Sequence, residues 1–177
     1  MAWDEDLFAV FDELEHRADA LYDLERLPEL ADRSRAEYAA ITLASRLMAS
    51  VDSDLALEVT GIGLVEGRLR RAAADWCLVR GTGQEWVLRT DALSVLRGLS
   101  DRSVPEMAWS PMARLGFGSA LRRIADTAER CVVRLRDGTA HDVVLRRVGA
   151  DFVEAEQGSG RLLLAFAGIA AVQSRDA

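Results

Sequence analysis

Two arginine-rich segments contain the residues of this sequence best suited to bind a ligand. Residues 69–76 and 145–152 each consist of a leucine, two arginines, a three-residue linker, an aspartate and an aromatic residue, and they lie 76 positions apart. Guanidinium groups bind phosphate and carboxylate oxygens in a planar, bidentate geometry. The candidate polyanion-binding residues are therefore Arg70, Arg71, Arg146 and Arg147.

The composition offers a second explanation for these arginines. All 22 basic residues are arginine, and the chain contains neither lysine nor asparagine, which a GC-rich genome explains without any functional demand. The arginine pairs could also form surface ion pairs with nearby acids such as Asp75, Asp151 and Glu154, where they would contribute little to stability. The sequence leaves both alternatives open.

The other chemically reactive side chains do not form a catalytic or metal-binding pattern. Cys77 and Cys131 lie in apolar, strand-like surroundings and are predicted to be buried, reduced thiols. His16 and His141 lack the spacing that would make them metal ligands together with these cysteines. We therefore predict no enzymatic activity, no metal and no cofactor.

The segments around the arginine pairs repeat with the same 76-residue offset. Alternating apolar and polar residues predict five short strands within 55–97 and again within 131–173. Five short strands suit a closed barrel, which removes exposed sheet edges. Asp75 and Asp151 are predicted to cap tight turns by accepting hydrogen bonds from local amides. The repeating unit is thus predicted to be a helix followed by a five-stranded β-barrel.

An amphipathic helix is predicted at the start of the chain, over residues 3–26. Acidic residues dominate one face, so that residues 1–54 carry a net charge of −9, whereas residues 55–177 carry +2. A lone helix of this length is marginally stable in water, so its apolar seam must pack on the chain's own body, a second copy or a partner protein. The seam has a coiled-coil-like spacing and consists of Leu7, Phe11, Leu14, Ala18 and Leu21.

The chain is predicted to be an α+β protein of four segments. Ser34 and Ser110, which also differ by 76 positions, are predicted to cap the helices that precede the two barrels, and the first of these helices is expected to run to Ala49. The segments are the N-terminal helix (1–30), the first helix and barrel (31–98), a connector (99–109), and the second helix and barrel (110–177).

This arrangement resembles the Sm-like fold of Sm, LSm and Hfq proteins and, more broadly, small SH3-like barrels. The Sm-like pattern has Asp-Gly after strand one, Gly-x-Leu in strand two and an aspartate before strand three. The second repeat contains Asp137-Gly138, the first contains Gly67-Arg68-Leu69, and both contain the aspartate. Leu88-Arg89-Thr90 is similar to the later Ile-Arg-Gly signature of the family, so the resemblance adds Arg89 to the candidate polyanion-binding residues.

The resemblance implies a non-enzymatic tandem-barrel protein that binds RNA or another polyanion through its arginines, because many Sm-like proteins bind single-stranded RNA. The alternative is a protein-interaction or assembly scaffold that uses the N-terminal seam. A small-molecule pocket between the two barrels is a third alternative. The chain is also similar in layout to uncharacterised actinobacterial proteins often labelled Fis-family regulators. That label implies a helix-turn-helix, but each predicted helix after Pro28 leads into a strand.

The sequence also predicts where the protein is found. No apolar run approaches the ~20 residues that a membrane-spanning helix needs. The start of the chain is acidic, whereas a signal peptide begins with basic residues. We therefore expect a cytoplasmic protein without a membrane partner.

Overall fold

The computed structural model describes Glu13, His16, Arg17 and residues 35–174. The chain divides after Ile41 into two units, 1–41 and 42–177. In the first unit, Arg17 and Glu13 form an exposed ion pair at 2.8 Å, and residues 35–39 are helical. The predicted seam lies outside the described residues and stays a prediction; its members are Leu7, Phe11, Leu14, Ala18 and Leu21.

The second unit is rich in β-structure, and its strands follow the expected alternation of buried and exposed residues. In the first strand, for example, Leu55, Leu57 and Val59 are buried while the residues between them are half-buried. The strands are β1 (Asp54–Val59), β2 (Gly63–Ala72), β3 (Trp76–Arg80), β4 (Glu85–Arg89), β5 (Leu93–Arg97), β6 (Arg130–Leu135), β7 (Ala140–Val148), β8 (Phe152–Gln157), β9 (Gly160–Ala165) and β10 (Ile169–Ser174).

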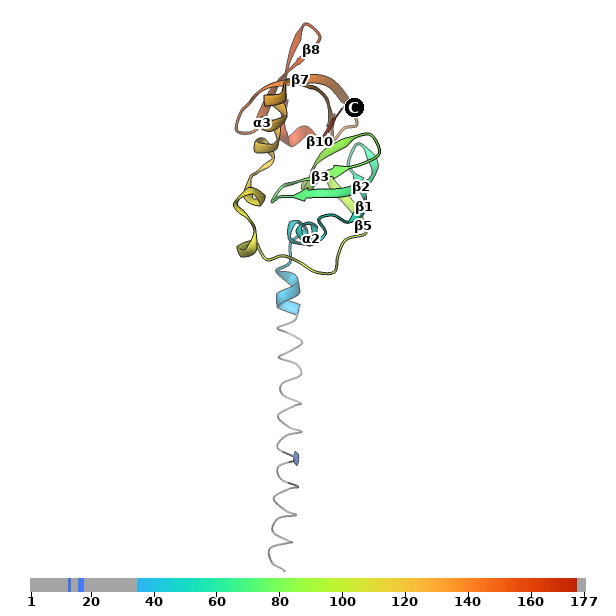
Figure 1. Ribbon diagram of the computed structural model, residues 1–177, viewed down its shortest axis with the longest axis vertical. Helices are drawn as coiled ribbons and strands as arrows, with labels where there is room; N and C mark the ends of the chain where they lie inside the picture. The colour runs from blue at the N-terminus through green and yellow to red at the C-terminus, as the bar shows by residue number, and fades with distance from the viewer. Residues whose placement is uncertain (1–12, 14–15, 18–34, 175–177) are drawn as a thin grey trace, which may run out of the picture. The chain divides into compact units, whose positions relative to one another are not determined.

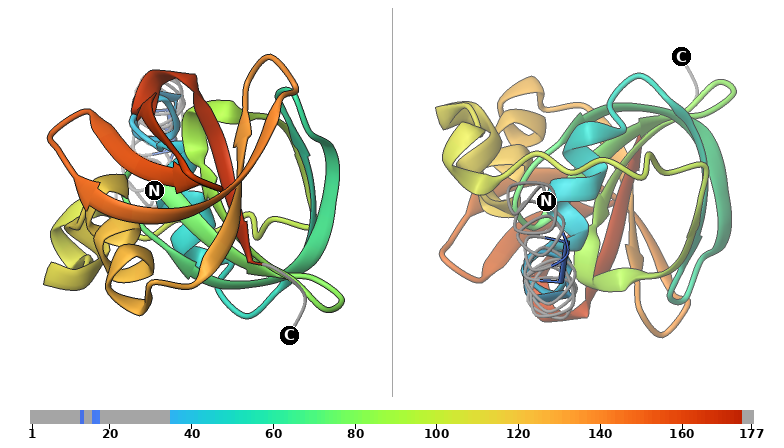
Figure 2. Two further views of the ribbon diagram at one scale, coloured as in Figure 1. Left: turned by 90° about the horizontal axis from the view of Figure 1, so that it is seen from above. Right: turned by 90° about the horizontal axis from the view of Figure 1, so that it is seen from below.

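All of these strands belong to one antiparallel sheet, in the order β5-β1-β2-β3-β4-β10-β6-β7-β8-β9. The prediction of two closed five-stranded barrels is therefore wrong. A closed barrel would pair β4 with β5, but the short 3₁₀ helix η1 (Thr90–Ala92) between them directs β5 across to β1. The free edge of β4 pairs instead with β10, where the two halves of the sheet meet (Figure 1). The strands bend strongly, so the open sheet is curled (Figure 2).

The 76-residue repeat is present in the structure although the barrels are not closed. We call α2 (Leu43–Ala49) and β1–β5 the first half and α3 (Phe117–Thr127) and β6–β10 the second half. Within each half the last strand pairs with the first, and the remaining strands follow in chain order. Equivalent strands begin at equivalent positions, such as Trp76 and Phe152 or Leu93 and Ile169, and η1 has its counterpart in η4 (Phe166–Gly168). The repeat therefore determines the order of strands within each half.

The two hydrophobic cores share residues across the junction between the halves. The core of the second half includes Trp76 and Val87 from the first half, and the core of the first half includes Ala170 and Ala171 from β10. Separate barrels would each keep their own core. Because each core needs a strand of the other half, we expect the two halves to fold and unfold together.

The helices are shorter than the sequence predicts. The expected helix from Ser34 to Ala49 is interrupted at residues 40–42, and α2 (Leu43–Ala49) begins after Thr42, whose hydroxyl accepts a hydrogen bond from the Ser45 amide. Ser110 caps only the 3₁₀ helix η3 (Pro111–Arg114). The extended backbone of Gly116 separates η3 from α3 (Phe117–Thr127), which packs on β7.

The connector between the halves contains one more short 3₁₀ helix, η2 (Glu106–Ala108). In the part of the chain that the structure describes, no helix combines the length and the apolar character needed to cross a membrane.

Candidate functional site

A β-bulge presents both arginines of each pair on the exposed face of the sheet. Side chains normally alternate between the two faces of a strand, so adjacent arginines should point in opposite directions. The register of β2 against β3 shifts between Leu69 and Arg71, and that of β7 against β8 shifts at the equivalent place. Leu69 is fully buried, whereas Arg70 and Arg71 are both exposed. The bulge thus adds a second outward-pointing side chain in each half.

The two members of each pair differ in their contacts. Arg70 forms an ion pair with Asp52 at 2.7 Å, and Arg146 forms one with Glu156 at 2.7 Å. Arg71 and Arg147 have no ion-pair partner within 4.0 Å among the described acids. Local acids therefore hold the first arginine of each pair and leave the second available.

The pairs do not lie on neighbouring strands. β2 and β7 are separated in the sheet by β3, β4, β10 and β6. The acids that hold Arg70 and Arg146 are also not the Asp75, Asp151 and Glu154 that the sequence suggests.

Arg89 supports the junction between the halves. Its Nε and Nη2 donate to the Asp91 carboxylate at 3.0 and 2.7 Å, and its Nη1 donates to the Phe166 carbonyl at 3.1 Å. The guanidinium also lies 5.3 Å from the ring centroid of Phe117, a cation–π distance. Arg136, which directly follows β6, binds the same Asp91 carboxylate at 2.6 Å. Arg89 is only 15% exposed and is committed to these contacts.

Two arginines that the sequence analysis did not single out lie beside Arg70. Arg68 on β2 and Arg80 on β3 are directly opposite each other in the sheet. Both side chains are more than half exposed, at 55% and 60%. Like charges in directly opposite positions normally destabilise a sheet. We call Arg68, Arg70 and Arg80 the arginine triad.

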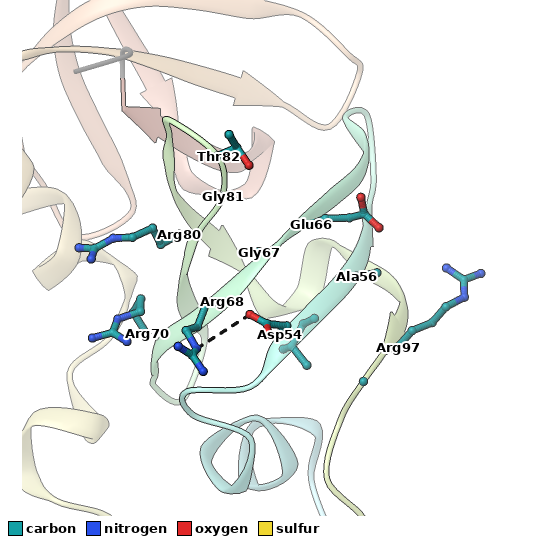
Figure 3. A pocket seen from close by; sticks show the side chains of 12 residues that line it. Asp54, Ala56, Glu66, Gly67, Arg68, Arg70, Arg80, Gly81, Thr82 and Arg97 are labelled. Carbon is teal, nitrogen blue, oxygen red and sulfur yellow. Dashed lines mark ion pairs between the residues drawn. The ribbon is translucent and has the colours of Figure 1, made fainter.

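The triad borders a shallow groove of about 810 Å³ on the first half. Glycines allow its strands to approach closely: a Cβ at Gly67 would overlap the Arg80 carbonyl, and one at Gly81 would lie 3.0 Å from the Glu66 carbonyl. Figure 3 shows Arg70 and Arg80 pointing to the same side, whereas Arg97 points to the opposite side of the groove. The groove therefore has one arginine-rich side.

The triad is held by local contacts that leave donors free. The Nε of Arg68 donates to the Asp52 carbonyl at 2.8 Å and lies 3.9 Å from the Asp54 carboxylate, the pair drawn in Figure 3. Arg80 donates to Glu85 through Nε and Nη2, at 2.8 and 2.6 Å. A guanidinium has more N–H groups than these contacts use, so each side chain is oriented and can still donate to a ligand.

The second half has no equivalent of the triad. Val144 and Glu156 occupy the positions of Arg68 and Arg80, and Glu156 neutralises Arg146. The position of Arg68 opposite Arg80 could not be predicted by counting residues from the turn, because the bulge between them and the turn shifts the register of β2 against β3.

Asp75 has a different role from the predicted local turn cap. Its carboxylate accepts the Phe117 amide of α3, at 2.9 Å to Oδ1 and 3.2 Å to Oδ2. The neighbouring Trp76 donates from Nε1 to the Leu115 carbonyl at 2.8 Å. These repeat residues thus anchor the start of α3 and the residue pair before it, Leu115 and Gly116, to the first half. Asp151, the counterpart of Asp75 in the second half, is exposed. Its backbone carbonyl accepts a hydrogen bond from the Phe166 amide.

The two cysteines are buried, free thiols, as the sequence predicts. Burial raises the pKa of the Cys77 thiol to about 12. Burial, with a smaller effect from the Asp142 carboxylate, raises the pKa of Cys131 to about 11. A thiol with a raised pKa is a poor nucleophile at neutral pH. The described residues contain no group of three or more His, Cys, Asp or Glu side chains that could hold a metal ion.

No protein-family model matches the sequence, and no curated protein shows a significant match to it. The function is therefore argued from the residues of this chain.

Proposed function

We propose that this chain is a non-enzymatic module that binds single-stranded RNA or another polyanion through the arginine triad. The observation that carries the proposal is the direct opposition of Arg68 and Arg80, with Arg70 two residues further along β2. Three cations on one exposed face favour a ligand with several negative charges. Such a ligand would offset the repulsion between the opposed arginines.

The acids around the triad are compatible with this function. The ion pairs of Arg70 with Asp52 and of Arg80 with Glu85 are exposed, and exposed pairs contribute only about 0–1 kcal/mol to stability. A phosphate can compete with such partners at modest cost. Arg71, which has no ion pair with a described acid, extends the same exposed stretch of β2.

Binding of this kind has a characteristic dependence on salt. Each phosphate that an arginine neutralises on a single strand releases counterions and contributes about −0.7 to the slope of log K against log salt concentration. A triad that contacts one phosphate per arginine gives a slope of about −2. The interaction requires no base contacts, so we expect little sequence preference.

Fluorescence anisotropy with a labelled single-stranded RNA, at several salt concentrations, tests the proposal. The double variant Arg68→Ala/Arg80→Ala is expected to weaken binding by about tenfold or more at low salt and to reduce the slope by about 1.4. Arg130→Ala is the matched control, because Arg130 is also an exposed strand arginine with an acidic partner, Asp142, but lies in the second half.

Two results would contradict the proposal: no RNA binding at low salt, or equal binding by the double variant and the wild type. The variant Arg146→Ala distinguishes the arginine triad from a binding surface that includes the arginine pair of the second half. A loss of affinity equal to that of the triad variant would favour the four-arginine surface formed by Arg70, Arg71, Arg146 and Arg147.

The alternative function, an assembly scaffold that uses the N-terminal seam, stays a prediction because the seam lies outside the described residues. Light scattering of the full chain and of a chain lacking residues 1–30 would test it. Equal molar masses and equal stabilities would argue against a role for the seam.

A further inference from the structure

The described sheet ends in two strands that each have one unpaired edge. β5 pairs only with β1, and β9 pairs only with β8. Their counterparts in the repeat are paired on both sides: β10 lies between β6 and β4, and β4 lies between β3 and β10. The free edge of β5 is therefore equivalent to the edge of β10 that lies at the junction, and the free edge of β9 is equivalent to the edge of β4 that pairs with it.

The junction shows how these edges fit together. β10 and β4 are antiparallel, with Ala171 opposite Leu88, Val172 opposite Val87 and Gln173 opposite Trp86. Ala171 and Leu88 are fully buried, and Val172 and Val87 are exposed by only 2% and 9%. The pairing thus buries apolar side chains as well as satisfying backbone hydrogen bonds.

The 76-residue offset transfers this register to the free edges. Val95 would face Leu164, Leu96 would face Leu163, and Arg97 would face Leu162. Leu163 is 64% exposed and Val95 is 38% exposed, although their counterparts Val87 and Ala171 are buried. The exposed apolar residues therefore lie where a second junction would cover them.

We propose that copies of this chain associate head to tail, with β9 of one copy pairing with β5 of the next in the register of the β4–β10 junction. A second copy is the indicated partner because this chain already joins the equivalent two edges within itself. Edge strands that avoid association usually have a charge or a proline in the middle. The centre of β9, Leu162-Leu163-Leu164, has neither, and its only arginine, Arg161, lies near the strand start.

The intermolecular contact would be weaker than the internal one. At the junction, the Glu85 amide donates to the Ser174 hydroxyl at 2.8 Å, and Gln173 bonds to Gln84 at 2.5 Å. The residue equivalent to Ser174 is Gly98, which has no hydroxyl. The residue equivalent to Asp91, which binds Arg136 across the junction, is Ala167. We therefore expect association that depends on protein concentration.

The contact joins two different surfaces, so it leaves one free β5 edge and one free β9 edge on every linear assembly. Such head-to-tail contacts produce rings when the rotation between copies closes and open chains when it does not. A contact of β5 with β5, or of β9 with β9, would stop at a dimer. The assembly mechanism goes beyond polyanion binding and does not depend on it.

Sedimentation velocity of the full chain over a range of concentrations tests the proposal. The wild type is expected to form species larger than a monomer as concentration rises. Val95→Lys and Leu163→Lys are each expected to raise the apparent dissociation constant by about tenfold or more, since a charge in the middle of an edge strand opposes pairing. Leu64→Lys is the matched control: Leu64 is 57% exposed, but it lies on β2 opposite Glu58 of β1 and not on either of the two end strands.

A mixture of the two edge variants distinguishes the head-to-tail contact from other contacts. At concentrations where the wild type associates and each variant alone is monomeric, an equimolar mixture is expected to form a 1:1 dimer between the intact β9 of Val95→Lys and the intact β5 of Leu163→Lys. A wild type that stays monomeric would overturn the proposal. Oligomers that survive both substitutions, an effect of only one substitution, or a mixture without dimers would also overturn it. Circular dichroism checks that each variant is folded, as expected for substitutions at exposed sites.

Discussion

The contact between Asp75 and α3 makes the substitution Asp75→Ala a direct test of how the first half supports the second. Gly116, which precedes α3, has no side chain that could accept a hydrogen bond from the helix N-terminus. The Asp75 carboxylate supplies that acceptor from 42 positions away, 2.9 Å from the Phe117 nitrogen. Alanine at position 75 would leave this partly buried amide without its partner.

The expected effect follows from two terms. An N-cap acceptor contributes about 1 kcal/mol to stability. A carboxylate beside a helix N-terminus adds about 0.3–1 kcal/mol through the helix dipole. We therefore expect Asp75→Ala to lower the free energy of unfolding by about 1.3–2 kcal/mol, with a fall in Tm of about 3–8 °C. Asp75→Asn keeps an acceptor but loses the charge, so it should recover about half of the loss.

The repeat provides a matched control in Asp151→Ala. The contact of Asp151 with the rest of its half is a backbone bond from the Phe166 amide at 2.7 Å, which the substitution does not remove. We expect a change within about 0.5 kcal/mol. Urea denaturation followed by circular dichroism, together with calorimetry, measures both variants. Equal losses at positions 75 and 151, or a loss below about 0.5 kcal/mol for Asp75→Ala, would refute the capping role.

Three further predictions concern the cores and the thiols. Leu69→Ala and Leu145→Ala, at equivalent buried positions, are each expected to lower the free energy of unfolding by about 2–5 kcal/mol in a single urea transition; two separate transitions would contradict the shared cores. Cys77 and Cys131 have pKa values raised from 9.0 to about 12 and about 11, so the folded protein should resist a thiol reagent at pH 8 until it is unfolded. Because unfolded thiols lose their protons near pH 9 and folded ones retain them, stability should fall as the pH rises from 9 towards 12, and less so in a Cys77→Ala/Cys131→Ala variant. Rapid modification of the folded protein at pH 8 would show that the thiols are accessible.

Local patterns in the sequence predict the strands, their repeat and much of each core. Leu55, Leu57 and Val59 alternate with more polar residues, and this period places them on the buried face of β1. The same alternation, displaced by 76 positions, predicts Cys131 and Val133 as buried residues of β6. These features depend on neighbours along the chain, which is why they can be predicted without the tertiary structure.

The candidate site could be predicted only in part. The arginine pairs were predicted from their recurrence, but the bulges that expose both members, the ion pairs that hold Arg70 and Arg146, and the position of Arg68 opposite Arg80 were not. A strand register depends on hydrogen bonds between segments, and one extra residue in a bulge changes every contact beyond it. The role of Arg89 at the junction depends in the same way on Phe166, 77 positions further along the chain.

The sequence by itself determined a duplicated set of five strands with buried leucines, buried thiols and recurring arginine pairs. Only the tertiary structure decided how the duplicated halves are joined. Neither half closes, since η1 directs β5 to β1 and leaves an edge of β4 for β10. Closing a barrel and joining two open halves satisfy the same backbone hydrogen bonds with the same local pattern. The difference lies in which edge meets which, and contacts between residues far apart in the chain make that choice.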